Sequence, residues 1–376
     1  MEKRPLAIFA IRQVRRATGA ARNAIEQAEY VRNMGYDIRI CAERVDRVKL
    51  AALGIRWIYI PRFPVKGYMR RVFFDWCVQR YVDYVKPELF ISHADACSRD
   101  ILVMHNCAEL AHEQVHKSAA PDDDELIRFQ RRVLQHGGFR YLIANSELMK
   151  RDFIERYELD SSKVGVFYQG VDTSIFNYLD HETFRYQGRR ILGLSDDAYV
   201  AGLVTSGAFL KRNVRFFLDV AAHVKNHISK VHFVIAGKDS SIESYRSYAK
   251  SLGLDGVVTF APTVDNVQLY FHALDVFVYP AKIEEYGRVV LEALACGTPA
   301  IISAAVGASE IMTLENIPKI IKGWDVERWA EEIIVLAKQP AKAQAYINAG
   351  ISLAERYSQS NRGEAMRELL ANLAVN

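Results

Sequence analysis

The sequence predicts an α/β protein of two domains, each with a parallel sheet covered by helices. Short apolar runs alternate with longer amphipathic stretches along nearly the whole chain, as in repeated βαβ units. The length of 376 residues exceeds one ordinary domain, and two domains of about 150–200 residues fit better. We expect residues 1–170, with a final helix at about 358–376, to form the first domain and residues 171–357 the second.

Composition limits the classes of function. Half of the residues are hydrophobic, which is enough for two cores, and a net charge of +4 is too small to indicate a nucleic-acid-binding protein. No apolar run approaches the roughly 18 residues of a membrane span. The five cysteines are scattered and lack C-x2-C spacing, which argues against a zinc site or a disulfide framework. We therefore expect a protein of the reducing cytoplasm that binds neither nucleic acid nor metal.

The first domain opens with a Rossmann-like unit of strand, turn, helix and strand. Residues 6–10 form the expected first strand, which ends before Arg12 and does not resemble a signal peptide. Gly19 marks the turn, a helix follows to Gly35, and residues 38–42 form the next strand. The turn lacks the G-x-G-x-x-G fingerprint, which argues against a dinucleotide-dependent dehydrogenase. Further apolar runs predict strands at residues 57–60, 89–92, 101–104 and 142–144.

The acidic run Asp122-Asp123-Asp124 has the spacing of a metal-binding D-x-D motif. Pro121 precedes the run and the amphipathic segment 126–135 follows it. Acidic residues stabilise the first turn of a helix, because the helix dipole is positive at that end. We therefore interpret these residues as charges at a helix start and not as a metal site.

The second domain begins with a strand at 199–205 and a glycine turn at Gly207. Lys211 and Arg212 follow the turn, just before a helix at 215–226. Two cations on a glycine turn at a helix start can hold a pyrophosphate. The alternative is a solvated basic turn, which is common.

Later elements of the second domain follow from the same pattern. Ser240 and Glu243 have the spacing of a capping box for a helix that reaches Leu252, and Asp265 is the expected cap of a helix at 267–273. Apolar runs predict strands at 231–237 and 257–260, and amphipathic runs predict helices at 326–337, 341–355 and 360–375. We expect the last helix to return to the first domain.

The stretch 274–311 is the most informative part of the chain. An apolar run at 276–279 predicts a strand buried on both faces, and a helical pattern starts at Arg288. Gly297 and Pro299 end that helix, and residues 298–303 predict the next strand. The stretch is therefore one βαβ unit.

Two carboxylates, Glu284 and Glu292, lie eight residues apart around the start of this helix. A helix N-terminus offers unpaired N–H groups and a positive dipole, and Gly287 lets the backbone come close to a phosphate there. Glu292, just over one turn in, could accept hydrogen bonds from two hydroxyls of a ribose. Phosphate and ribose together indicate a nucleoside diphosphate.

The same stretch resembles the E-x7-E motif of the retaining glycosyltransferases of family 4, which have the GT-B fold. The family motif reads E-P-F-G-x-x-x-x-E-A-x-A-x-G-x-P, and this chain has Glu284-Glu285-Tyr286-Gly287 followed by Glu292-Ala293, Ala295, Gly297 and Pro299. The resemblance implies two Rossmann-like domains facing across a cleft, with the nucleotide-sugar on the C-terminal domain. It also implies that Glu284 binds hydroxyls of the donor sugar, that Glu292 binds the ribose, and that the donor is contacted by Tyr286, Gly287, Arg288 and Val289.

Other positions match family residues outside this motif. In the family, a histidine after the strand at 101–104 reaches the donor sugar, and His105 stands there; His93 is a weaker candidate for contacting the acceptor. The family's Arg and Lys that neutralise the leaving diphosphate correspond to Lys211 and Arg212 in reversed order, after Gly207. Gly19 matches the second glycine of a loop at which donor and acceptor approach the backbone, whereas Thr18 replaces the first.

The resemblance implies a retaining transfer of a hexose from a nucleotide-diphosphate sugar, expected to be a UDP-sugar, to a hydroxyl of a glycan or glycolipid. Within the family, segments 58–93 and 129–175 resemble most the enzymes that add the first glucose to heptose of the lipopolysaccharide core. No cofactor is expected, because the nucleotide-sugar is a substrate. Two alternatives stay open: a nucleotide-sugar 2-epimerase of the same fold, and a non-catalytic sugar-binding protein.

Two further expectations concern charged residues. Residues 62–76 interleave four cations with five aromatic residues, which predicts docking of the first domain on the anionic inner face of the cell membrane. The alternative is that the aromatic residues after Val72 form the core face of a helix. Arg288 replaces the aliphatic residue usual in the family, and we expect it either to contact a donor phosphate or an acidic sugar or to turn to solvent.

Overall fold

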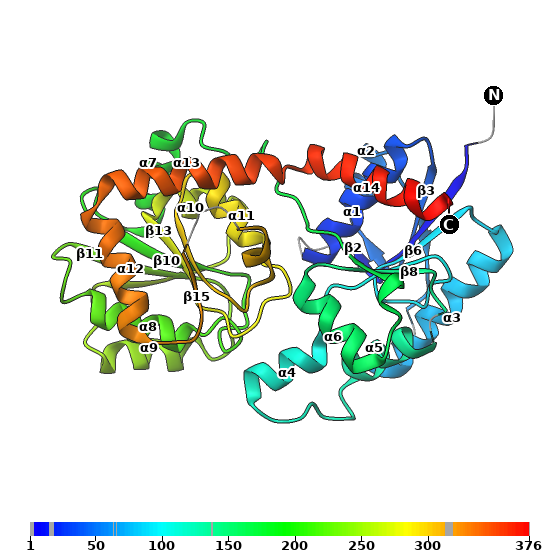
Figure 1. Cartoon of the computed structure of the whole chain (residues 1–376), viewed down its shortest axis with the longest axis horizontal. Coiled ribbons are helices and arrows are strands. Elements are labelled where there is room, and N and C mark those ends of the chain that lie inside the picture. Colours follow the sequence, from blue (N-terminus) through cyan, green and yellow to red (C-terminus); the bar gives the residue numbers. More distant parts are fainter. Residues whose placement is uncertain are drawn as a thin grey trace. The chain divides into compact units, whose positions relative to one another are not determined.

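The computed structural model describes residues 4–14, 19–62, 64, 66–136, 138–312 and 319–375. The chain divides into two compact units, one formed by Met1–Gln169 with Ser360–Asn376 and the other by Gly170–Gln359. Each unit consists of a parallel sheet with helices packed against it (Figure 1). The predicted class, two α/β domains with parallel sheets, is confirmed.

The sheet of the first unit has seven parallel strands in the order β5-β3-β1-β6-β7-β8-β9. The central strand β1 pairs with β3 on one side and with β6 on the other, so the order reverses between β1 and β6. Side chains of β1 and β3 form the middle of a large apolar core. The strands are β1 (Leu6–Ala10), β3 (Asp37–Ala42), β5 (Arg56–Tyr59), β6 (Leu89–Ser92), β7 (Ile101–Val103), β8 (Tyr141–Ala144) and β9 (Val164–Val166), with the small pair β2 (Gln13–Val14) and β4 (Arg44–Val45) beside them.

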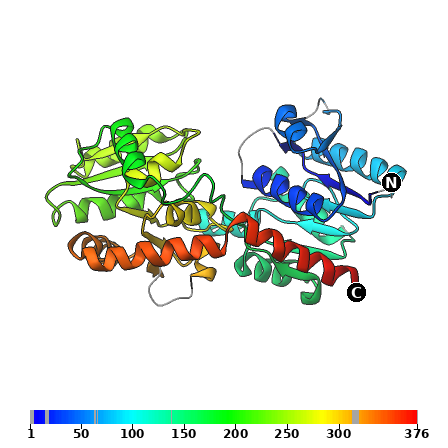
Figure 2. The ribbon, with the colours of Figure 1, turned by 90° about the horizontal axis from the view of Figure 1, so that it is seen from above.

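The helices of the first unit include one from the far end of the chain. Met366 and Leu370 of α14 (Gln359–Val375) lie in the same core as β1, and Gly363 packs against Tyr30 of α1. Figure 2 shows α14 running beside α1. The other helical segments are α1 (Gly19–Asn33), α2 (Arg47–Ala52), α3 (Tyr68–Val85), α4 (Ala108–His116), α5 (Glu125–His136), α6 (Glu147–Tyr157) and the 3-10 turn η1 (Ser161–Lys163).

The second unit has a six-stranded parallel sheet in the order β12-β11-β10-β13-β14-β15. Its strands are β10 (Tyr199–Val204), β11 (Val231–Ala236), β12 (Val258–Ala261), β13 (Val276–Tyr279), β14 (Ala300–Ser303) and β15 (Lys319–Ile321). Its helical segments are α7 (His181–Leu192), α8 (Val214–Val224), α9 (Ile242–Ser251), α10 (Gln268–Ala273), α11 (Arg288–Ala295), η2 (Gly307–Ile311), α12 (Val326–Lys338) and α13 (Pro340–Arg356). The order reverses between β10 and β13, and β13 leads into the region of the two motif carboxylates.

Two expected helix caps are wrong. Helix α9 starts after Ser241 without a side-chain cap, so the predicted capping box does not form. Asp239 accepts the Ser241 N–H instead, because it lies in the turn that precedes the helix. Helix α10 starts after Val267, also without a side-chain cap, so Asp265 lies too early to cap it.

Helix α3 carries most of the segment expected to reach a membrane. Phe74 is fully buried and belongs to the core, as the alternative anticipated. Arg71 is also mostly buried and its Nη1 lies 3.4 Å from the Asp95 carboxylate, so it is wrong to count this cation as membrane-facing. Trp76 and Met69 are exposed, whereas Phe63 lies outside the described residues. Among the described residues, no helix is long and apolar enough to span a bilayer.

Candidate active site

Helix α11 starts from a glycine that its surroundings require. Gly287 is the N-cap and has a φ of 91°, which L-residues with a side chain rarely adopt. A Cβ there would lie 2.9 Å from Cγ1 of Val306. The glycine thus lets α11 begin this close to Val306. The N–H groups of the first helical turn point out of the N-terminal end of α11.

Glu284 is held by its backbone on both sides. Its N–H donates to the Ala305 carbonyl at 3.0 Å, and its carbonyl accepts the Gly307 N–H at 2.9 Å. This short parallel bridge to Val306 fixes the direction of the side chain. The Glu284 carboxylate accepts a hydrogen bond of 3.1 Å from the Tyr279 hydroxyl at the end of β13.

Several residues of the loop after β10 have positive φ angles. Gly207 has a φ of 152°, and a Cβ there would meet the Lys238 carbonyl oxygen at 2.5 Å, so the position accepts only glycine. Ala208 and Asn213 also have positive φ angles, and Asp239 accepts the N–H of Phe209 at 2.9 Å. The loop turns sharply and carries Lys211 and Arg212 toward the motif carboxylates.

Each of these two cations meets one carboxylate. Nη1 of Arg212 lies 2.5 Å from Oε2 of Glu284, and Nζ of Lys211 donates to Oε2 of Glu285, also at 2.5 Å. All four side chains are mostly buried. We call Lys211, Arg212, Glu284 and Glu285 the charged cluster.

Burial and neighbouring charges shift the pKa values of side chains at the charged cluster in opposite directions. Burial alone would lower the pKa of Arg212, but Tyr279, Glu284 and Glu285 outweigh it and raise that pKa above its ordinary value. Burial raises the pKa of Tyr279 well above 10, although Arg212 lowers it. The guanidinium is therefore charged and the phenol is neutral at ordinary pH, and the phenol can donate to Glu284.

The remaining motif residues lie along the start of α11. Tyr286 is buried, and its carbonyl accepts the Ala308 N–H at 2.7 Å. Arg288 is only 7% exposed, so the expectation that it turns to solvent is wrong. Val289 is partly exposed, and Glu292 is 3% exposed. The second unit thus brings the charged cluster, Gly207 and the first turns of α11 together.

Two histidines lie at the carboxyl ends of neighbouring strands in the first unit. His93 follows β6 and His105 follows β7, and Nδ1 of His93 lies 2.9 Å from Nε2 of His105. The rings are stacked, with 9° between their planes. Burial lowers the pKa of His105 to about 4 and that of His93 well below 6.5, so the histidine pair is neutral at ordinary pH. Gly19 is the exposed first residue of α1, with no atom within 4 Å of an added Cβ.

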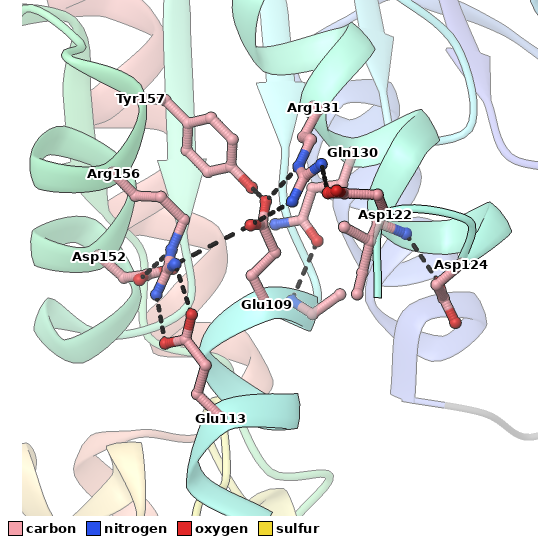
Figure 3. A network of polar contacts seen from close by, with 11 residues as sticks. Glu109, Glu113, Asp122, Asp124, Gln130, Arg131, Asp152, Arg156 and Tyr157 are labelled. Carbon is pink, nitrogen blue, oxygen red and sulfur yellow. Dashed lines mark hydrogen bonds and ion pairs between the residues drawn. The ribbon is translucent and has the colours of Figure 1, made fainter. Parts of the chain in front are cut away.

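The loop after His105 is anchored by one buried amide. Gln130 of α5 donates to the Asn106 carbonyl at 3.2 Å and accepts the Ala108 N–H at 3.0 Å. Figure 3 shows the neighbouring network, in which Arg131 and Tyr157 converge on Glu109 of α4.

The acidic run lies at the edge of this network. Asp124 accepts the N–H groups of Leu126 and Ile127 at the start of α5, and Asp122 pairs with Arg131. These contacts agree with the interpretation of the run as charges at a helix start. Among the described residues, no group of three or more His, Cys, Asp or Glu side chains is placed to hold a metal ion.

Comparison with family models identifies both halves of the chain. The model described as "Glycosyltransferase Family 4" matches residues 17–175, and the model "Glycosyl transferases group 1" matches residues 193–353. The chain belongs to the glycosyltransferases that these two models describe. The resemblance inferred from the E-x7-E motif is confirmed.

Solved structures place this glycosyltransferase in the expected GT-B fold class. WaaG, a glycosyltransferase involved in lipopolysaccharide biosynthesis, superimposes with a TM-score of 0.80 over 96% of this chain and 99% of WaaG, at 16% identity. HepE from Anabaena, solved in complex with UDP and glucose, gives a TM-score of 0.76 over 97% of this chain and 99% of HepE, also at 16% identity.

Curated relatives match at somewhat higher identity but over a shorter part. The D-inositol 3-phosphate glycosyltransferase of Mycobacterium marinum is 29% identical over 235 residues, which are 60% of this chain and 48% of the relative. The corresponding protein of Mycobacterium avium is 29% identical over 234 residues, which are 60% of this chain and 53% of the relative. The chain spans about half the length of the curated relatives it matches.

Sequence reasoning missed two members of the site in this glycosyltransferase. Glu285 stands inside the motif, but its contact with Lys211 joins positions 74 residues apart, which no local pattern reports. Tyr279 looked like the last residue of a buried strand, and its hydroxyl contact with Glu284 depends on the turn that follows β13. A polar atom at the end of an otherwise apolar strand was the available signal for Tyr279.

Proposed function

We propose that the chain is a retaining hexosyltransferase that moves a sugar from a UDP-sugar to a hydroxyl of a glycan or glycolipid acceptor. One observation carries the proposal: Lys211 and Arg212 reach the carboxylates next to the Gly287 turn, at the N-terminus of α11. Two cations and a helix N-terminus are the groups that bind a diphosphate. The two cations lie on the loop after β10, whereas the helix N-terminus follows β13, far away in sequence. This meeting of distant segments argues against a solvated basic turn.

The rest of the donor follows from the position of the diphosphate. Glu292, one turn into α11, would accept hydrogen bonds from the ribose hydroxyls, and Glu284 would accept them from the donor sugar. Tyr286, Arg288 and Val289 would contact the donor along the same turn, and Gly207 would let the loop after β10 approach the phosphates. In the first unit, His105 would contact the donor sugar and Gly19 would allow close approach of the backbone.

The mechanism proposed is a front-face transfer. The departing diphosphate takes the proton of the incoming hydroxyl, while Lys211, Arg212 and the helix start stabilise the negative charge that develops on its oxygens. Glu284 pairs with Arg212 and accepts from Tyr279. A carboxylate held in this way suits a hydrogen-bonding role better than that of a nucleophile. The residues named supply charge and position without a cofactor.

The comparisons support the donor class more than the acceptor. HepE was solved with UDP and glucose, WaaG takes part in lipopolysaccharide biosynthesis, and the mycobacterial relatives act on an inositol phosphate by name. We propose lipopolysaccharide or another cell-surface polysaccharide as the destination of the sugar.

A donor screen followed by a product assay tests the proposal. Thermal shift with UDP-, GDP- and ADP-sugars should give the largest stabilisation with a UDP-hexose. The wild-type protein should then release UDP and form a glycoside with the anomeric configuration of the donor, as read by NMR. Formation of ManNAc from UDP-GlcNAc would indicate an epimerase, and binding without any release of UDP would indicate a non-catalytic sugar-binding protein.

We also propose that the first unit docks on an anionic membrane, where a lipid-linked acceptor would lie. Met69, Trp76 and Lys66 are exposed on or just before α3, and each cation near an anionic leaflet contributes about 1 kcal/mol. Sedimentation with anionic liposomes at low salt should pull down the wild-type protein. Lys66→Glu combined with Trp76→Ser should weaken this, while Lys338→Glu on α12 should not. A wild-type protein that stays in the supernatant would contradict the docking.

A further inference from the structure

Glu285 is the member of the charged cluster that the proposed function leaves without a role. Glu285 is 5% exposed and follows directly after Glu284 in the sequence. Its Oε2 accepts a hydrogen bond of 2.5 Å from the Lys211 ammonium. The contact is well buried on the side of the carboxylate, so it is not a solvent-screened surface pair of small effect.

The contact fixes where the ammonium lies. A lysine side chain has a flexible four-carbon stem and a compact charge, and it carries considerable rotamer entropy when unpaired. The Lys211 carbonyl accepts the Lys282 N–H at 2.9 Å, which holds the backbone, and Glu285 then holds the tip of the side chain. The ammonium is therefore positioned before any ligand binds, beside Arg212 and the start of α11.

In the same contact, the carboxylate of Glu285 balances the positive charge of Lys211. In the charged cluster, Glu284 lies against Arg212 and Glu285 lies against Lys211, so the two cations are matched one for one by carboxylates. A diphosphate brings negative charge to this place and must compete with both carboxylates. A carboxylate that stays beside the ammonium repels the incoming phosphate, because like charges at close range oppose one another.

We propose that Glu285 is a positioning residue of the donor site, which orients Lys211 and weakens the binding of the diphosphate to it. This inference rests on the proposed function. Its consequence is that the nucleotide product leaves readily, since the carboxylate takes back the ammonium as the diphosphate departs. Removal of the charge on Glu285 should therefore strengthen binding of the nucleotide, whereas removal of a merely structural contact would weaken it.

Calorimetric titration of UDP into the full chain tests the inference. Glu285→Gln keeps the size of the side chain, and UDP should bind about tenfold more tightly, which corresponds to about 1.4 kcal/mol at 25 °C. Glu285→Ala should also tighten binding, and it serves where the glutamine variant does not fold. Glu285→Asp retains the charge and should stay near the wild-type affinity. Glu332→Gln is the matched control, since it neutralises the partner of Lys319 in another ion pair of the same unit.

Steady-state kinetics adds a second measurement. With Glu285→Gln, KM for the donor should fall, and kcat should fall as well if the release of UDP limits turnover. The inference would be overturned if folded Glu285→Gln or Glu285→Ala bound UDP no more tightly than the wild-type protein. A loss of affinity in these variants and in Glu285→Asp alike would also overturn it. A wild-type chain that binds no UDP would instead overturn the proposed function.

Discussion

The two units hold polar side chains at the carboxyl ends of their sheets in different ways. In the first unit, His93 and His105 share one hydrogen bond, and burial keeps both rings uncharged. In the second unit, the charged cluster holds two cations against two carboxylates. An uncharged imidazole pair can bind a hydroxyl but attracts no anion, whereas an ion pair can exchange one anion for another. The charged cluster is therefore the part of the second unit that suits an anion, and the histidine pair is the part of the first unit that suits an uncharged hydroxyl.

The largest expected effect in this comparison comes from Arg212. Arg212→Gln removes the guanidinium that would stabilise the leaving diphosphate, and we expect kcat to fall about 10²–10³-fold, as when one donor to a developing anion is removed. Steady-state kinetics with the best UDP-sugar measures it. Arg246→Gln, which removes the cation of an exposed pair with Glu243, should leave kcat unchanged. A folded Arg212→Gln protein with wild-type kcat would exclude a role for this residue in catalysis.

Glu292 tests the same unit through binding alone. Glu292→Gln replaces a buried ionised acceptor by a neutral amide, so UDP should bind more weakly by about 1–3 kcal/mol. Calorimetry on the folded variant and the wild-type protein measures the difference. An unchanged affinity for UDP would remove Glu292 from the site.

The histidine pair predicts that the first unit is sensitive to acid. The pKa of His105 is about 4 in the folded protein and about 6.5 in the unfolded chain, so the unfolded chain takes up the proton first. Its contribution to stability is complete above about pH 6.5 and is lost as the pH falls toward 4; by pH 5 the loss is about 2 kcal/mol.

Urea unfolding at pH 7 and pH 5 measures this loss. His93→Phe removes one of the two imidazoles and should reduce the difference between the two pH values, while His116→Gln, a change at an exposed histidine of the same unit, should not. Equal stability of the wild-type protein at both pH values would contradict the assignment of a neutral buried pair.

Arg288 gives the smallest expected change. Its burial at the first position of α11 suits a contact with a donor phosphate, and Arg288→Leu should weaken UDP binding by about 1 kcal/mol, a typical net value for one hydrogen-bonded contact. The same titration measures it. Donor affinity and turnover that are both retained in Arg288→Leu would indicate a purely structural side chain.

Much of the fold could be predicted from the sequence because strands and helices follow local patterns. The runs at 6–10 and 276–279 coincide with β1 and β13, and Gly287 lies at the start of α11 as the helical pattern from Arg288 indicated. The predicted capping box failed because α9 starts after Ser241 and not after Ser240, and Asp239 accepts the Ser241 N–H in the turn before the helix. The residue at which a helix starts depends on the backbone angles of that turn, which a local pattern does not report.

The candidate site could be predicted only in part. The E-x7-E spacing and the pair Lys211-Arg212 were visible, because each is a short pattern. The assignment of each cation to its carboxylate was not visible, since Lys211 and Glu285 meet only after β10, β13 and their loops have folded. The buried state of Arg71 was hidden for the same reason: Asp95, its partner, lies in a loop 24 residues further along the chain.

A crystal structure of the full chain with UDP tests the central claim most directly. The account predicts the diphosphate against the N-terminus of α11 beside Gly287, with its oxygens within hydrogen-bonding distance of Arg212 and Lys211, and the ribose hydroxyls on Glu292. A nucleotide bound elsewhere, with the Arg212–Glu284 and Lys211–Glu285 contacts intact and no phosphate near them, would contradict it.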